Sequence, residues 1–290
     1  MKKYLITLGR IKKGFILLFL LNLLLFSVTF IIQSCQSNDL FSDNKIIEAE
    51  NSFKSTAFNS LYKLNNITLQ NKTNNEFNTA SRINGEVALI EVYLSNGTSS
   101  TPSISENLNL NELVNIDNID LKVKYLDGSE SDNIANEQTL VNTYQISVPQ
   151  AQQALEPTLI QAKNYLYAKG LTDLDIQFLL AADEEGPAMQ ESALIPIVMQ
   201  LIAVEQNQNV ASNVNYLSFF GSSAHASQIG ECAGDALGFS AIAGLAAGSL
   251  ETSAGKALLK KAIRKIASRA LGWVGAAIFT YEFGDCMGWW

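Results

Sequence analysis

The feature that most constrains this chain is its beginning, where basic residues precede a long apolar run. The first 35 residues contain five Lys or Arg and no acidic residue. Residues Phe15 to Ile32 are apolar except for three polar positions. This order is that of an export signal, and the run also approaches the ~20 residues that cross a bilayer. Because the basic flank stays in the cytoplasm in both cases, we expect the rest of the chain to fold outside it.

A cysteine, Cys35, follows the small residue Ser34 just after the apolar run. This arrangement resembles the lipobox of bacterial lipoproteins, whose cysteine is acylated and becomes the mature N-terminus. The resemblance implies a signal peptide over 1–35, lipidation of Cys35, a tether over 36–43, and attachment to the outer membrane in the cell envelope, facing the periplasm or the surface. The alternative is an uncleaved transmembrane anchor at Phe15 to Ile32. The whole chain resembles uncharacterised Gram-negative envelope lipoproteins, a likeness that implies no known activity.

The charge of the next segment excludes one class of partner. Residues 36–229 carry nine basic and 23 acidic residues, a net charge of −14. Such a surface repels phosphate backbones, so we expect no nucleic-acid partner. The single histidine, His225, lies in a Ser- and Gly-containing stretch, and no phosphate loop or dinucleotide fingerprint is present. We therefore predict no cofactor, no metal site and no catalytic residues. The protein is expected not to be an enzyme.

Hydrophobic periodicity predicts a small, helix-rich α+β domain over residues 44–210. Helices are expected at 44–64, 149–169 and 187–205, the last with a kink or break at Pro196. Strands are expected at 86–94, 119–126 and 140–148, with the last two as neighbours joined by a loop that starts at Asp127. Residues 173–181 fit either a strand or a short helix. A Ser/Gly linker is expected over 211–228.

The C-terminal segment, residues 229–290, is rich in Gly and Ala and is predicted to be an α-helical hairpin. Gly at four-residue spacing leaves a groove along one helix face that lets a second backbone approach. Thr252 to Gly255 interrupts the pattern, and a second arm is expected to run from Lys256 through Gly272 toward Gly288, with a bend near Gly272. The expected helix-packing glycines are Gly230, Gly234, Gly238, Gly244 and Gly248.

Two further predictions concern this hairpin. Cys232 and Cys286 remain as a pair in an oxidising compartment, which favours a disulfide that closes the hairpin. The second arm also has a basic face that can meet the acidic domain of the same chain or anionic lipid. The residues predicted to contact a membrane or an acidic partner are Lys256, Lys260, Lys261, Arg264, Lys265, Arg269, Trp273, Trp289 and Trp290.

Residues 228–290 resemble glycine-zipper bacteriocin-like peptides in their small-residue helices, basic amphipathic segment, terminal aromatics and bracketing cysteines. They differ from such peptides in that the chain has no Gly-Gly pair. We expect a lipid-anchored envelope protein that acts without catalysis, by membrane or protein contact through the hairpin. Its expected partners are the membrane through Cys35, and anionic lipid or an envelope protein. The alternatives are a bacteriocin-like membrane-inserting tail, or a hydrolase or binding module on the acidic domain.

Overall fold

The computed structural model describes residues 44–71, 87–95, 102, 104–105, 107–125, 129, 138–212, 250, 252–270 and 272–290. Residues 49–290 form one compact unit. The predicted signal peptide, membrane anchor and tether, with Cys35, lie outside the described residues, as do Cys232 and the glycines from Gly230 to Gly248. Of the predicted linker, the structure describes only residues 211 and 212, which end a helix.

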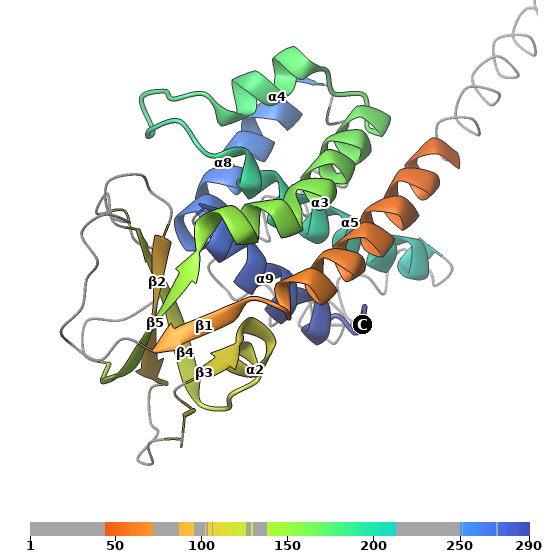
Figure 1. The fold of residues 1–290 in the computed structure, drawn as a ribbon. Coiled ribbons are helices and arrows are strands. Elements are labelled where there is room, and N and C mark those ends of the chain that lie inside the picture. Colours follow the sequence, from red (N-terminus) through yellow and green to blue (C-terminus); the bar gives the residue numbers. More distant parts are fainter. Residues whose placement is uncertain are drawn as a thin grey trace, which may run out of the picture. The chain divides into compact units, whose positions relative to one another are not determined.

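A five-stranded sheet forms one layer of this unit (Figure 1). Its strands stand in the order β3-β1-β5-β2-β4, and each neighbouring pair is antiparallel. The bounds are β1 Thr68–Asn71, β2 Val87–Leu94, β3 Asn107–Asn109, β4 Ile119–Tyr125 and β5 Leu140–Ser147. Side chains alternate between the two faces of a strand. The buried face carries Leu69, Ala88, Ile90, Val92, Leu108, Leu121, Val123, Tyr144 and Ile146.

The three predicted strands are present, but the expected pairing between 119–126 and 140–148 is wrong. β2 lies between β4 and β5 and pairs with both, placing Ile90 opposite Val123 on one side and Tyr144 on the other. β2 is apolar on both sides of its pleat at Leu89 and Ile90, which suits a central strand. β4, in which only Leu121 and Val123 are buried, lies at the edge of the sheet.

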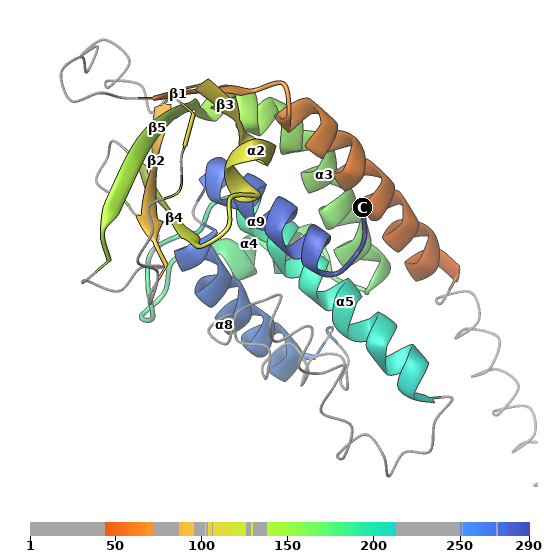
Figure 2. The same cartoon turned by 90° about the horizontal axis from the view of Figure 1, so that it is seen from below.

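The helices lie against one side of the sheet (Figures 1 and 2). A helix over residues 44–64 is followed in the chain by α2 Leu110–Val114, α3 Val148–Ala168, α4 Asp173–Leu180, the 3-10 turn η1 Glu191–Ala193, α5 Leu194–Ser212, α8 Ser253–Arg269 and α9 Gly272–Cys286. The ambiguous segment 173–181 is therefore a helix. The α+β class predicted from the sequence is confirmed.

Local signals set two of these boundaries. Gly170 has φ 86°, and the Leu171 N–H donates to the Leu166 carbonyl oxygen at 3.1 Å, which closes α3 with a left-handed residue that glycine adopts without strain. Pro196 lies in the first turn of α5, since the 3-10 turn precedes that helix at Leu194. A proline in the first turn of a helix causes no kink. The interruption expected at Pro196 is instead the change from the 3-10 turn to α5 at Leu194.

The last helix, α9, is the centre of the helical layer. It contacts α3, α5 and α2, and its residues from Val274 to Tyr281 are all buried. A helix that is apolar all round belongs in a core. The expected bend near Gly272 is a complete break, because α8 ends at Arg269 and α9 starts at Gly272 with φ 63°.

The described part of the tail therefore belongs to the same compact unit as the acidic domain. α8 packs against α4 and α5, and α9 packs against α3 and α5. The first arm of the predicted hairpin lies outside the described residues, so the hairpin itself stays a prediction. Among the helices that the structure describes, none combines the length and apolar character needed to cross a bilayer.

Candidate functional site

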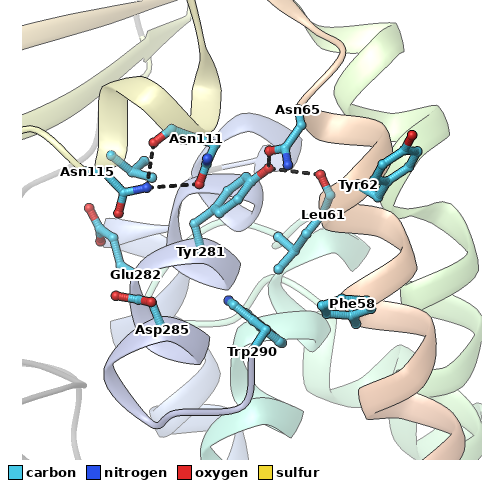
Figure 3. A pocket seen from close by; sticks show the side chains of 11 residues that line it. Phe58, Leu61, Tyr62, Asn65, Asn111, Asn115, Tyr281, Glu282, Asp285 and Trp290 are labelled. Carbon is cyan, nitrogen blue, oxygen red and sulfur yellow. Dashed lines mark hydrogen bonds between the residues drawn. The ribbon is translucent and has the colours of Figure 1, made fainter.

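A pocket of about 200 Å³ opens where the helix over 44–64, α2 and α9 meet (Figure 3). Phe58, Tyr62 and Asn65 lie on one side of it, and the side chains of α2 and α9 lie on the other. The remaining lining residues are Leu61, Asn111, Val114, Asn115, Tyr281, Glu282, Asp285 and Trp290. Pockets that bury drug-sized ligands measure roughly 300–1,000 Å³. This pocket therefore fits a smaller ligand or one part of a larger one.

Tyr281 fixes the back of the pocket. Its hydroxyl lies 2.8 Å from the Leu61 carbonyl oxygen and also contacts Oδ1 of Asn65. Burial raises the pKa of this phenol well above its ordinary value, so the hydroxyl stays protonated and donates. With its oxygen engaged by Tyr281, Asn65 keeps an amide NH₂ that has no partner among the described residues.

The amides of α2 form part of the opposite wall. Asn109 caps α2 by accepting from the Glu112 N–H, and the Glu112 side chain accepts from the Asn109 N–H in return. At the other end, Nδ2 of Asn115 donates to the carbonyl oxygen and to Oδ1 of Asn111, both at 2.9 Å. This leaves the Asn111 NH₂ and the Asn115 Oδ1 available to a ligand.

Two carboxylates, Glu282 and Asp285, lie one turn apart on α9 at the pocket. Neither has a hydrogen-bonding or ion-pairing partner within the part of the chain that the structure describes. Glu282 is exposed at the rim of the pocket. Desolvation of its carboxyl group by the surrounding protein nevertheless raises the pKa to about 7, and the negative charge of Asp120 raises it further. The pocket therefore carries two acidic side chains that have no cationic partner among the described residues.

Trp290 forms the floor between the two walls (Figure 3). A left-handed Gly288, with φ 65°, ends α9, and the Trp289 N–H turns back to the Gly284 carbonyl oxygen at 2.9 Å. The Trp290 ring then lies on Gly284, where an added Cβ would stand 1.6 Å from Cζ2. The indole Nε1 is buried and has no hydrogen-bond partner among the described residues. A buried N–H without a partner favours a ligand that supplies an acceptor.

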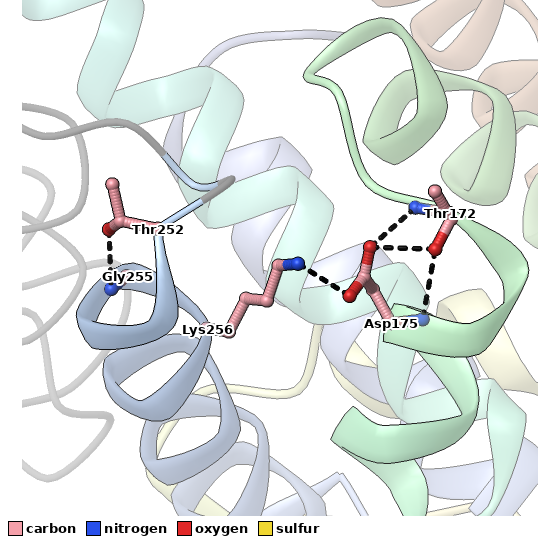
Figure 4. Close-up of polar contacts among 5 residues, drawn as sticks. All are labelled: Thr172, Asp175, Thr252, Gly255 and Lys256. Atoms are coloured by element: carbon pink, nitrogen blue, oxygen red, sulfur yellow. Dashed lines mark hydrogen bonds and ion pairs between the residues drawn. The ribbon is translucent and has the colours of Figure 1, made fainter.

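The basic face of α8 meets the acidic domain of the same chain. Lys256 pairs with Asp175 at 2.6 Å (Figure 4), and Lys260 and Arg264 both pair with Asp183, at 2.8 and 2.5 Å. The Lys256 hydrogen bond, helped by Thr172, lowers the pKa of Asp175 to about 2. The hydrogen bond from Lys260 contributes most to lowering the pKa of Asp183, also to about 2. Three of the six predicted contact cations therefore already have anionic partners in this fold.

The other predicted contact residues are spread over the tail. Lys261 and Lys265 are exposed on α8, and Arg269 is its last residue. Trp273 is partly buried in the first turn of α9. Trp289 is in edge contact with the Phe283 ring, with centroids 5.9 Å apart, and Lys54 lies 5.0 Å from the Trp289 ring centroid.

Cys286 is disulfide-bonded. The chain has two other cysteines, Cys35 and Cys232, and both lie outside the described residues. The bridge between Cys232 and Cys286 therefore stays a prediction.

Sequence reasoning missed every pocket residue except Trp290. One signal was present: Glu282 and Asp285 are acidic residues three apart in an otherwise apolar helix, so they share a face that core packing does not explain. Phe58 follows the buried residue Ala57 in the same helix, yet its side chain is 55% exposed.

Comparison of the chain with protein-family models, with curated proteins and with solved structures gives no match. Within the described residues, no group of three His, Cys, Asp or Glu side chains is placed to hold a metal ion.

Proposed function

We propose that the protein is a lipid-anchored extracytoplasmic binding protein, and that it takes a small polar ligand in the pocket between α2, α9 and the helix over 44–64. The observation that carries this proposal is the set of unpaired polar groups gathered there. A buried N–H normally finds a partner, yet the buried Trp290 indole N–H has none among the described residues. Glu282 and Asp285 lie exposed beside it, also without a protein partner in the described part of the chain. A bound ligand supplies those partners.

The packing of the tail supports binding within the fold over action by a separate tail. α9 is part of the core, and Lys256, Lys260 and Arg264 pair with aspartates of the same unit. Membrane insertion of the tail, as in the bacteriocin-like alternative, requires α9 to leave its contacts with α3 and α5. Leakage of anionic vesicles by the full chain would support that alternative.

Binding is tested by the melting temperature of the full chain against a library of small polar compounds. A ligand that binds only the folded state raises the melting temperature as its concentration exceeds Kd. Asp285→Asn keeps the shape of the side chain and should remove most of the shift, whereas Lys265→Ala, on exposed α8 surface, should keep it. A shift that survives Asp285→Asn places the binding elsewhere.

Anchoring is tested by intact mass after extraction from membranes. A lipid mass on a chain that starts at Cys35 is expected, and Cys35→Ser should move the protein to the soluble fraction. Alkylation with and without reduction, followed by peptide mapping, identifies the cysteine that is bonded to Cys286. A mass without lipid contradicts the anchor.

One observation favours a second function, hydrolysis in the same pocket. A carboxyl group with a pKa of about 7 retains a proton near neutral pH and suits a general acid. Asp285, one turn away, would be the second carboxyl group of the pair that glycoside hydrolysis uses. A hydrolase panel on the full chain tests this, and activity that persists in Glu282→Gln excludes that role.

A further inference from the structure

The chemistry of the pocket narrows the class of ligand, provided that the proposed binding function is correct. Its free groups include both donors and acceptors. The donors are the amide NH₂ of Asn65 and the indole N–H of Trp290, and the acceptors are the carboxylates of Glu282 and Asp285. A ligand that satisfies this set must itself accept and donate within a small volume.

Aromatic side chains flank these polar groups. Phe58 and Tyr62 lie four residues apart on one helix face, at the lip of the pocket, and are 55% and 72% exposed. Large exposed rings beside a polar pocket offer a flat apolar surface to a ligand. The negative face of an aromatic ring attracts the C–H hydrogens of a ligand ring that stacks on it.

Other ligand classes leave part of this set unsatisfied. An anion is repelled by Glu282 and Asp285, with Asp120 nearby. A simple organic cation pairs with the carboxylates and stacks on the rings, but it has no acceptor for the Trp290 N–H. An apolar molecule satisfies neither donors nor acceptors. A hydroxyl group donates one hydrogen bond and accepts two, so a ring with several hydroxyl groups satisfies donors and acceptors together.

We infer that the pocket binds one neutral sugar ring, with its hydroxyl groups on Asp285, Glu282 and Trp290 and the adjoining part of the glycan stacked over Phe58 and Tyr62. The volume of about 200 Å³ is small against the roughly 300–1,000 Å³ of drug-sized sites, which is why one ring enters and the rest lies on the lip. The acidic residues then act as hydroxyl acceptors.

The Trp290 indole N–H is a direct reporter of this binding. The chain has three tryptophans, so ¹⁵N-tryptophan labelling of the full chain gives three indole signals, and Trp290→Phe assigns the relevant one. The titrants are neutral hexoses, N-acetylhexosamines and their short oligomers, with glucuronate as the anion and tetramethylammonium, which has no acceptor, as the cation. We expect at least one neutral sugar to shift the Trp290 signal, and glucuronate and tetramethylammonium to leave it in place.

Two variants separate the roles of the two parts of the site. Tyr62→Ala, at a highly exposed position, should weaken oligosaccharide binding about tenfold and leave the binding of a single sugar nearly unchanged. Asp285→Asn should weaken both by about tenfold or more. Tyr167→Ala removes an exposed tyrosine on α3 and should change neither.

The outcomes distinguish the two proposals. If no neutral sugar shifts the Trp290 signal, the saccharide inference is wrong. If tetramethylammonium shifts it instead, the pocket is still a binding site, but its ligand is an organic cation. If no titrant or library compound shifts it, both the saccharide inference and the proposed binding function fail.

Discussion

Gln200 in α5 gives a prediction whose sign is opposite to that of most core substitutions. Its side chain is fully buried, and within the described part of the chain neither Nε2 nor Oε1 has a hydrogen-bond partner. The surrounding turns of α5, from Leu194 to Val204, are buried and otherwise apolar. Met is unbranched, has a similar length and carries no strongly polar atom. The change Gln200→Met therefore keeps the shape and removes two unsatisfied groups.

The size of the effect follows from the cost of such groups. A buried donor or acceptor without a partner costs about 1–3 kcal/mol, and the amide of Gln200 has one of each. Allowing for imperfect fit of the new side chain, which costs up to about 1.5 kcal/mol, we expect Gln200→Met to raise the free energy of unfolding by about 2 kcal/mol. For a unit of this size, that corresponds to a rise in melting temperature of roughly 4–8 °C.

Urea unfolding followed by circular dichroism, under non-reducing conditions, measures this change. The matched control is Gln206→Met in the same helix, because Nε2 of Gln206 donates to Oε1 of Glu50 at 2.6 Å. The control should lose stability, by about 1.5–3 kcal/mol for a hydrogen bond to a charged group. If Gln200→Met is also less stable than the parent, the Gln200 amide has a partner in solution and the reasoning is refuted.

Three further substitutions test the core and the pocket. Phe283→Ala removes a fully buried ring and should cost about 3–5 kcal/mol in urea unfolding; an unchanged curve would mean that α9 is dispensable. Gly284→Ala puts a Cβ into the space of the Trp290 ring, so tryptophan emission should shift to the red, and unchanged emission contradicts that packing. Glu282 has a pKa of about 7 in the folded protein, against an ordinary value of 4.5. Between these pH values the folded state binds more protons than the unfolded state, so the parent should lose stability as the pH rises from about 4.5 to 7. In thermal scans, Glu282→Gln should reduce this dependence of the melting temperature on pH, and an unchanged dependence would show that other groups cause it.

Local patterns predicted most elements of the fold, because each pattern depends on residues that are close in the sequence. The alternation in Ile119–Tyr125 predicts a strand with one wet face, and β4 has that character. The segment after Thr172 was ambiguous by periodicity, although Thr172 and Asp175 form a capping box that marks the start of a helix.

Neighbour relations between distant elements could not be predicted in the same way. Nothing near residues 119–147 indicates that β2 inserts between β4 and β5, because the pairing depends on complementary packing across the whole sheet. The charges of α8 did indicate an acidic partner within the chain as one alternative, but charge pattern alone does not choose Asp175 and Asp183 over lipid headgroups. The pocket needs side chains from three elements that lie far apart in the sequence.

The position of α9 at the centre of the helical layer also has a consequence for the order in which the molecule can form. The Tyr281 hydroxyl reaches the Leu61 carbonyl oxygen across 220 residues, and the Tyr125 hydroxyl accepts from the Val274 N–H at 3.2 Å across 149. A ribosome makes the sheet, α3 and α5 before it makes α9, which packs against those two helices. Contacts of such long range slow folding. Until α9 has been made, the apolar faces of α3 and α5 that it covers stay exposed.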